Sequence, residues 1–250
     1  MIFYFTATGN SKFIAERIAA KTNDSLVNIA ECIQAGNFSF ELKNDEAIGF
    51  VVPVYAMGIP MIVTDFLKSI SISVTPNNYA FAVLNSGGTT GNAGKMIDKY
   101  VKLNAVFGIK TVDNYVPMSK VASDEIINMQ LDKAEEDIDE IVNYVMEKKN
   151  GGFNNLKGPV PGLLTALAHP IFMSSRKTAK FTVNENCNGC GLCEKICPRS
   201  VIKINDGKPT WEKPQCEICL ACLHRCPKTS INYGKKTAVN GRFVNKRVEF

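Results

Sequence analysis

Two copies of one cysteine pattern occupy residues 187–226 of this 250-residue chain. Each copy reads C-x2-C-x2-C-x3-C-P, and together they hold eight of the nine cysteines: Cys187, Cys190, Cys193, Cys197, Cys216, Cys219, Cys222 and Cys226. Three thiols at every third position can each reach one corner of an inorganic cubane, and this spacing is typical of [4Fe-4S] sites. The repeat therefore predicts two [4Fe-4S] clusters rather than a disulfide scaffold.

Structural zinc is the alternative ligand of such a cysteine set. Zinc sites usually pair two CxxC knuckles across a longer gap, whereas here an evenly spaced triplet with a trailing Cys-Pro occurs twice. The repeated triplet favours iron–sulfur, and metal analysis would separate the two. The ninth cysteine, Cys32, stands alone, and we expect it to be an ordinary buried or half-buried thiol.

Residues 180–235 resemble the two-cluster bacterial ferredoxins through this repeated motif. The resemblance implies a small α+β domain in which the fourth thiolate of each cluster comes from the other motif. It gives one cluster the ligands Cys187, Cys190, Cys193 and Cys226, and the other the ligands Cys216, Cys219, Cys222 and Cys197.

Charge is divided unevenly along the chain. Residues 1–150 have a net charge of −5 and residues 151–250 a net charge of +10. A basic half can indicate nucleic acid, but these charges are scattered and lack interleaved aromatic residues. Anionic clusters would offset much of the excess, so we expect no nucleic-acid partner.

Apolar runs and helical patterns alternate through the first 150 residues. A short apolar run at 1–5 ends before a helix that Asn10 or Ser11 can cap. Further apolar runs lie at 26–29, 47–54, 79–84 and 106–116, with helical stretches at 60–70, 91–103 and 123–149. This alternation predicts an α/β fold, a doubly wound sheet of five parallel strands.

The loop after the first run, TATGNS at residues 6–11, suggests an anion site. Neither G-x-G-x-x-G nor a Walker loop is present. Thr6, Thr8, Asn10 and Ser11 bring donors, Gly9 allows close backbone approach, and the helix start adds amide groups. Such a loop can hold a phosphate dianion by hydrogen bonds alone, although a helix cap without ligand has the same pattern.

The same loop resembles the phosphate loop of the flavodoxins, T-x-T-G-N-[ST]. The resemblance implies a flavodoxin-like domain that binds FMN outside the carboxyl ends of its strands. It implies cofactor contacts from Thr6, Ala7, Thr8, Gly9, Asn10 and Ser11, from Pro53, Val54, Tyr55, Ala56, Met57 and Gly58, and from Asn85, Ser86, Gly87, Gly88, Gly91 and Asn92. Tyr55 is a candidate to stack on the flavin, and a core tyrosine is the alternative. Residues 85–92 lack an aromatic residue, which predicts an open flavin face.

These features predict a flavodoxin-like FMN domain at 1–150, a linker at 151–179, a two-cluster ferredoxin domain at 180–235 and a tail at 236–250. The linker contains an apolar stretch at 162–173, which is short and interrupted by Pro170, so it predicts no membrane span. We expect it to pack between the domains or onto a partner, and we expect His169 within it to be structural.

The whole chain resembles the flavodoxin–ferredoxin fusion proteins of anaerobic bacteria. The resemblance implies an electron-transfer protein that relays electrons between two [4Fe-4S] clusters and FMN, with ferredoxin-dependent oxidoreductases as redox partners. The alternative is a flavoenzyme that reduces a quinone or nitro compound; no catalytic acid, base or nucleophile is apparent. No basic, apolar leader follows Met1, so we expect a cytoplasmic protein. A homodimer, and electron transfer within or between chains, stay open.

Overall fold

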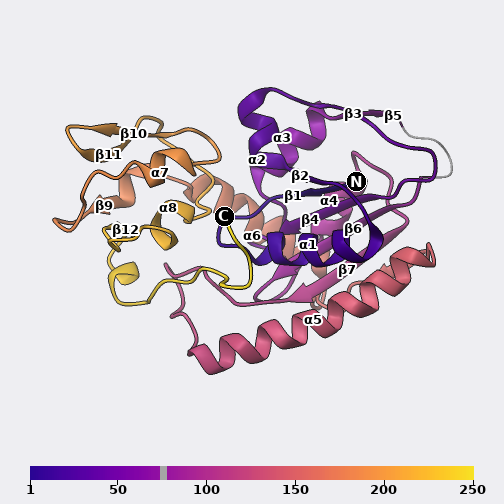
Figure 1. Cartoon of the computed structure of the whole chain (residues 1–250). Coiled ribbons are helices and arrows are strands. Elements are labelled where there is room, and N and C mark those ends of the chain that lie inside the picture. Colours follow the sequence, from indigo (N-terminus) through magenta and orange to yellow (C-terminus); the bar gives the residue numbers. More distant parts are fainter. Residues whose placement is uncertain (74–77) are drawn as a thin grey trace.

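A six-stranded, wholly parallel sheet forms the centre of the N-terminal part (Figure 1). The computed structural model describes residues 1–73 and 78–250. The strand order is β2-β1-β4-β6-β7-β8, with β1 at Ile2–Tyr4, β2 at Leu26–Asn28, β4 at Ile48–Pro53, β6 at Ala80–Ser86, β7 at Ala105–Lys110 and β8 at Gly151–Phe153. The predicted parallel α/β fold is confirmed.

The sheet has one strand more than the five predicted. Strand β8 pairs with β7 at the edge, where Gly151 N–H donates to Asn104 O at 2.9 Å. Its sequence, GGF, has two glycines and no alternation of apolar residues, a pattern that favours a helix stop over a strand. Backbone pairing with a neighbouring strand, which the local sequence does not encode, makes it a strand.

Helices cover both faces of the sheet. Helix α1 (Asn10–Thr22) and the long α5 (Asp124–Met146) bury Phe13, Ile18 and Ile138 against one face. On the other face lie α2 (Ile29–Ala35), α3 (Met61–Ser69) and α4 (Ala93–Asp98), and a small parallel pair, β3 (Ser39–Glu41) and β5 (Ser71–Ser73), lies beside them. This doubly covered sheet explains why its strands are apolar runs without alternation.

The C-terminal part consists of short elements. Antiparallel pairs form between β9 (Phe181–Val183) and β12 (Ile231–Tyr233), and between β10 (Ile202–Asn205) and β11 (Lys208–Trp211). The remaining elements are α7 (Leu192–Lys195), α8 (Ala221–His224) and the 3-10 turns η1 (Thr178–Lys180) and η2 (Lys236–Ala238). Each of α7 and α8 begins inside one cysteine motif, so the sequence repeat is also a structural one.

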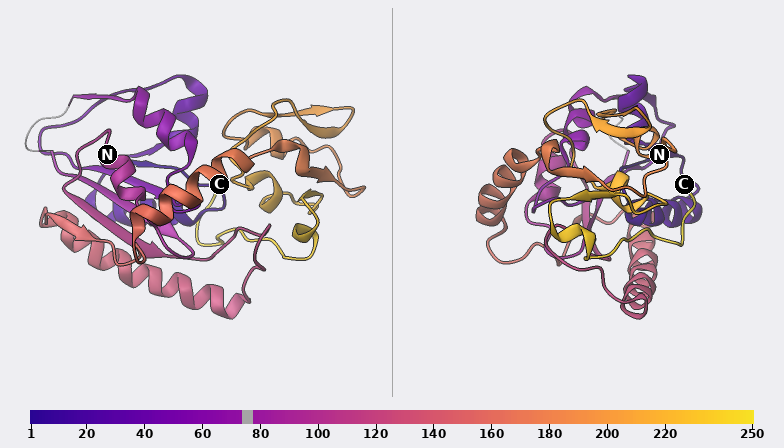
Figure 2. Two further views of the ribbon diagram at one scale, coloured as in Figure 1. Left: turned by 180° about the vertical axis from the view of Figure 1, so that it is seen from behind. Right: turned by 90° about the vertical axis from the view of Figure 1, so that its left-hand side faces the viewer.

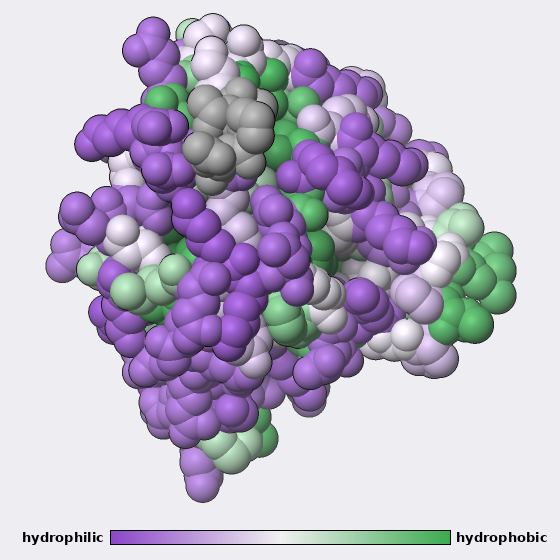
Figure 3. All heavy atoms as spheres, turned by 90° about the vertical axis from the view of Figure 1, so that its right-hand side faces the viewer, coloured by the Kyte–Doolittle hydropathy of each residue, from purple (hydrophilic) through white to green (hydrophobic). Residues whose placement is uncertain are grey.

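Helix α6 (Pro161–Ser175) connects the two parts, and Figure 2 shows it running beside the sheet toward the C-terminal part. Leu163, Leu167 and Ile171, spaced by four, are exposed. Figure 3 shows a hydrophobic projection on its right-hand edge, the side on which α6 lies. Within residues 1–73 and 78–250, no helix has the length and apolar character needed to cross a bilayer.

Polar side chains join the two parts directly. Arg199 Nη2 lies 2.7 Å from Asp65 Oδ2 of α3, and Arg199 Nε lies 2.6 Å from the buried Glu217. Gln34 of α2 donates to the carbonyl of Cys197 at 2.9 Å. The C-terminal part is therefore held against α2 and α3, next to the carboxyl ends of the strands.

Candidate functional site

A cavity of about 880 Å³ lies at the carboxyl ends of the sheet strands. Its volume is in the range of small-molecule and cofactor sites. Five segments supply its walls: the loops after β1, β4, β6 and β7, and helix α6, with residues 218–220 closing the side toward the C-terminal part. Parallel strands bring these loops to one edge, where open α/β sheets bind ligands.

Most of the residues predicted to contact a cofactor line this cavity: Thr6, Ala7, Thr8, Asn10, Ser11, Pro53, Val54, Tyr55, Ala56, Met57, Asn85, Ser86, Gly87 and Gly88. Four predicted residues are not among its lining: Gly9, Gly58, Gly91 and Asn92. Their surroundings give the reason, because each faces another segment of the chain.

The three glycines make room for neighbouring segments. A Cβ at Gly58 would lie 2.4 Å from His169 Nδ1, and one at Gly91 would lie 2.4 Å from Thr165 Oγ1, both on α6. A Cβ at Gly9 would lie 2.9 Å from Asn245 Cβ in the C-terminal tail. Close packing of other segments therefore accounts for these glycines.

Three hydroxyl groups of the β1–α1 loop line the cavity and can donate hydrogen bonds to a ligand there. Thr6 Oγ1 accepts from Gly9 N–H at 3.0 Å, Thr8 Oγ1 accepts from Asn114 Nδ2, and Ser11 Oγ accepts from Asn85 Nδ2 at 3.1 Å. Since each hydroxyl oxygen already accepts one hydrogen bond, its proton is free to donate. Loop and helix start together offer an anion site without a cation.

The side chain of Asn85 acts on the site through its neighbours. Its Oδ1 accepts from Thr111 Oγ1 and its Nδ2 donates to Ser11. All three residues are buried. Asn85 thus fixes the direction in which the Ser11 hydroxyl points.

Sequence reasoning missed a group of cavity residues, most of which lie beyond the three predicted loops. They are Thr89, the loop after β7 with Thr111, Val112, Asp113, Asn114, Tyr115, Met118 and Ser119, the α6 residues Ala168, Ile171, Phe172 and Ser175, and Ile218, Cys219 and Leu220. The loop after β7 could have been expected near the cavity, because the apolar run at 106–116 predicts a further parallel strand, and the carboxyl ends of parallel strands meet at one edge of the sheet. The α6 contacts leave no local pattern.

Helix α6 is fastened to the loop after β4. Thr165 Oγ1 donates to Met57 O at 2.8 Å and accepts from Asn92 N–H at 2.9 Å. His169 Nδ1 lies 3.1 Å from Tyr55 O. Because a carbonyl only accepts, Nδ1 carries the proton, which supports the structural role predicted for His169.

Aromatic side chains that line the cavity come from outside residues 85–92. Phe172 of α6 meets Tyr55 edge to face, with ring centroids 5.9 Å apart, and meets Tyr115 at 6.4 Å. The absence of an aromatic residue from 85–92 is therefore offset by α6 and by the loop after β7.

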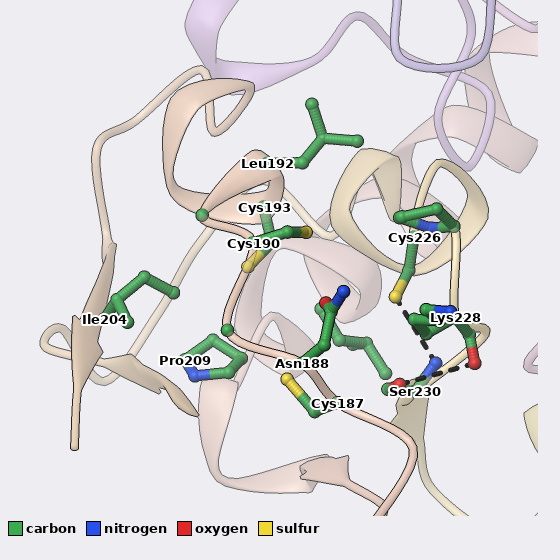
Figure 4. A pocket seen from close by; sticks show the side chains of 14 residues that line it. Cys187, Asn188, Cys190, Leu192, Cys193, Ile204, Pro209, Cys226, Lys228 and Ser230 are labelled. Atoms are coloured by element: carbon green, nitrogen blue, oxygen red, sulfur yellow. Dashed lines mark hydrogen bonds between the residues drawn. The ribbon is translucent and has the colours of Figure 1, made fainter. Parts of the chain in front are cut away.

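Two smaller cavities gather the eight motif cysteines into two sets of four. Cys187, Cys190, Cys193 and Cys226 surround the first (Figure 4). The second is lined by Cys197, Cys216, Cys219 and Cys222. Each set takes three thiols from one motif and one from the other. Across residues 1–73 and 78–250, no three His, Cys, Asp or Glu side chains converge on the position of a single metal ion.

The backbone around these thiols suits anionic sulfur. The N–H groups of Val201, Ile218 and Ser230 donate to Cys197, Cys216 and Cys226 Sγ at 3.3–3.4 Å. Burial raises the pKa of Cys193 and of Cys216 to about 11. Bound metal is what would stabilise the thiolate form in such buried surroundings.

Family comparisons agree with both halves of the geometry. Residues 1–110 match the family model described as a flavodoxin domain, and residues 186–231 match that of a 4Fe-4S dicluster domain. This chain joins a flavodoxin domain to a dicluster domain. The predicted combination of a flavodoxin-like domain with a [4Fe-4S] domain is confirmed. A flavodoxin domain implies FMN and a dicluster domain implies iron–sulfur, and together they imply a role in electron transfer.

One curated relative matches a small part of the chain. It is a component of the ion-translocating oxidoreductase complex of Methanosarcina acetivorans, 33% identical over 55 residues, which are 22% of this chain and 21% of that protein. The chain thus spans about a fifth of the length of that relative.

Solved structures also share a likeness with this chain. The rubredoxin oxygen:oxidoreductase of Desulfovibrio gigas is 15% identical, with 59% of this chain and 36% of that chain covered and a TM-score of 0.36. An FMN-dependent NADH-azoreductase from Bacillus anthracis is 12% identical, with 57% and 99% covered and a TM-score of 0.33.

The dicluster domain contributes one wall of the flavodoxin cavity. Cys219 and Leu220 line both that cavity and the second cysteine cavity. Burial raises the pKa of Tyr55 well above its usual value, and the charges of Cys219 and Glu217 raise it further. The Tyr55 phenol therefore stays neutral beside the second cysteine set.

The second motif adopts a strained backbone where the first uses glycine. Gly189 and Gly191 have φ values of +69° and +76°, and the corresponding Ile218 and Leu220 have +49° and +60°. Positive φ is costly for a β-branched residue. The second motif keeps apolar side chains at these positions, and both line the flavodoxin cavity.

Proposed function

We propose that this protein transfers electrons between FMN in the flavodoxin domain and two [4Fe-4S] clusters in the dicluster domain of the same chain. The observation that carries the proposal is the common wall. Cys219 lines both the flavodoxin cavity and the second cysteine cavity. FMN exchanges one or two electrons and a cluster exchanges one, so their pairing suits a protein that connects one-electron carriers to a two-electron partner.

FMN fits the flavodoxin cavity by its donors and its walls. We assign its phosphate to the hydroxyls of Thr6, Thr8 and Ser11 and to the first backbone N–H groups of α1. The first helical bond of α1 runs from Phe13 N–H to Gly9 O, so the N–H groups before Phe13 have no acceptor within the helix. The ring system is assigned to the walls built by Tyr55 and Tyr115. Phe172 from α6 would limit access of water to it.

The two cysteine sets fit two clusters. We assign Cys187, Cys190, Cys193 and Cys226 to the first cluster and Cys197, Cys216, Cys219 and Cys222 to the second, because the structure gathers the thiols in these sets. The first set includes an exposed thiol, Cys190, whereas Cys197 and Cys222 of the second are buried. The first site is therefore the one that a carrier protein reaches.

We propose that the partners are proteins that exchange single electrons at the first site, and ferredoxin-dependent oxidoreductases are the class we expect. The relative from Methanosarcina acetivorans, named as part of an oxidoreductase complex, supports a redox partner. Eight thiols reserved for clusters fit a reducing compartment, so we place the protein in the cytoplasm.

A second candidate function is reduction of a small acceptor at the flavin. Met118 lines the cavity and is 78% exposed, so the cavity opens to solvent at that side chain. A quinone or nitro compound could enter there. Asp113, which also lines the cavity, accepts from Ser119 Oγ at 2.9 Å.

The test is composition and turnover of anaerobically purified protein. We expect about eight irons and one FMN per chain, as two cubanes and one flavin require. Zinc without iron, or iron without flavin, would refute the proposal. Reoxidation of the reduced protein by one small acceptor, much faster than by any carrier protein, would select the second candidate function.

A further inference from the structure

The last eleven residues, 240–250, form a strap that returns from the dicluster domain to the flavodoxin domain (Figure 1). Asn240 Nδ2 donates to Val116 O at 2.8 Å, and Asn240 O accepts from Val121 N–H at 2.9 Å. Phe243 is buried, and its N–H donates to His224 Nδ1 at 3.1 Å. The strap is thus fixed to both domains before it reaches the anion loop.

At the loop, the strap contacts each of its three central residues. Asn245 is 1% exposed, its N–H donates to Thr8 O at 2.8 Å, and its Nδ2 donates to Asn10 Oδ1 at 3.2 Å. Its Cβ and Val248 Cγ2 lie 2.9 Å from the position of a Cβ on Gly9. The outer surface of the loop is therefore covered by the strap, and its inner surface faces the cavity.

These contacts determine how the loop presents its donors. In a trans peptide the C=O and N–H groups point in opposite directions. Because Asn245 holds the Thr8 carbonyl outward, the N–H of Gly9 points inward, where Thr6 Oγ1 accepts it at 3.0 Å. Likewise Asn10 Oδ1 is held by the strap, so its Nδ2 is directed to Val112 O at 3.3 Å.

We propose that Asn245 is a positioning residue for recognition of the flavin phosphate, acting through Thr8 and Asn10. The inference rests on the proposed function, since it requires that FMN binds. The strap touches the loop that takes the phosphate, whereas the ring system is assigned to Tyr55, Tyr115 and α6. Its contribution is therefore specific to the phosphate: FMN depends on it and riboflavin, which lacks the phosphate, does not.

The experiment compares FMN with riboflavin. Protein freed of flavin, with its iron retained, is titrated anaerobically with each flavin, and binding is followed by the loss of flavin fluorescence. Asn245→Ala loses the bond to Asn10, and we expect its Kd for FMN to rise about tenfold, the effect of one lost hydrogen bond. The Kd for riboflavin and the iron content should stay at wild-type values. Val239→Ala, 76% exposed and just outside the strap, is the matched control.

The outcomes separate the two proposals. Wild-type protein that binds no FMN would overturn the proposed function. FMN binding by Asn245→Ala equal to that of wild type, or an equal loss of FMN and riboflavin, would overturn the role of the strap. If Asn245→Ala loses iron, Asn245→Asp, which keeps the size of the side chain but cannot donate to Asn10 Oδ1, takes its place. A loss confined to FMN then supports the role, and any other result overturns it.

Discussion

Tyr55 of the flavodoxin domain and Cys219 of the dicluster domain line the same cavity. Cys219 also belongs to the second cysteine set, so one side chain is common to the two proposed cofactor sites. Ile218 and Leu220 lie on either side of it in left-handed backbone conformations. The close approach of the two sites is thus built into one chain and needs no second copy.

Electron transfer between flavin and clusters should therefore be independent of protein concentration. When protein reduced by dithionite is mixed with a limiting oxidant, we expect a first-order rate of flavin reoxidation that is unchanged over a wide range of protein concentration. Tyr55→Leu, which removes the ring beside Cys219, should slow this step several-fold, and Tyr55→Phe should not. Tyr100→Leu, at a surface tyrosine, is the control. A rate proportional to protein concentration would show transfer between molecules and contradict the prediction.

Arg199 is expected to hold the two domains together. Its guanidinium joins Asp65 of α3 to Glu217, which is 2% exposed. Arg199→Ala leaves the Glu217 carboxylate buried without its partner, which should lower the free energy of unfolding by about 3 kcal/mol, the lower end for a buried pair because Arg199 is 21% exposed. The urea midpoint of anaerobic protein measures this. Arg17→Ala, which breaks an exposed pair with Glu135, should cost about 1 kcal/mol or less.

A second variant distinguishes the cost of the unpaired buried Glu217 carboxylate from the cost of losing the Arg199 side-chain contacts. Adding Glu217→Gln to Arg199→Ala removes the uncompensated carboxylate, so part of the stability should return. If the double variant is less stable than Arg199→Ala alone, the explanation by an unpaired buried charge fails.

The strands, the cysteine motifs and the anion loop can be predicted from the sequence because each is encoded by a local pattern. Each predicted strand is an apolar run that a doubly covered sheet requires, and each cysteine motif has fixed spacing. The hydroxyls of Thr6, Thr8 and Ser11 were predicted to surround an anion, and they line the cavity. Local patterns of this kind survive without knowledge of the rest of the chain.

The features that could not be predicted depend on distant contacts. Strand β8 exists because β7 offers it an edge. Sequence reasoning predicts that Gly9 faces a ligand, yet the strap occupies that space. The contact is not predictable locally, because Asn245 lies more than two hundred residues away in sequence. Phe172 belongs to an apolar stretch whose position against Tyr55 is fixed by Thr165 and His169. None of these pairings leaves a pattern in either segment alone.

Gly58 should be required for the position of α6 against the loop after β4. A Cβ there would lie 2.4 Å from the His169 ring, so Gly58→Ala must push the helix away and break the bond from His169 to Tyr55 O. We expect weaker FMN binding and faster amide exchange in α6. Gly152→Ala is the control, since a Cβ at Gly152 would meet only the end of the Lys157 side chain, at 3.3 Å, and Gly152 does not line the cavity.

Relief of the clash provides the check on this explanation. In the double variant Gly58→Ala with His169→Ala, the added methyl group no longer meets a ring, so exchange in α6 should be slower than in Gly58→Ala alone. Equal exchange in the two would mean that the glycine is needed for the backbone of its own loop instead.

Because each cysteine set takes thiols from both motifs, the arrangement predicts which pairs of cysteine substitutions remove the same cluster. Cys187 and Cys226 belong to different motifs but line one cavity. If they hold one cluster, Cys187→Ser, Cys226→Ser and the double variant should each retain about four irons per chain, because all three disable the same cubane. Cys187→Ser combined with Cys197→Ser should retain none, since Cys197 lines the other cavity. Iron analysis with spin counting on reduced protein measures both. Four irons left in the Cys187/Cys197 pair, with none in the Cys187/Cys226 pair, would mean that each motif holds its own cluster.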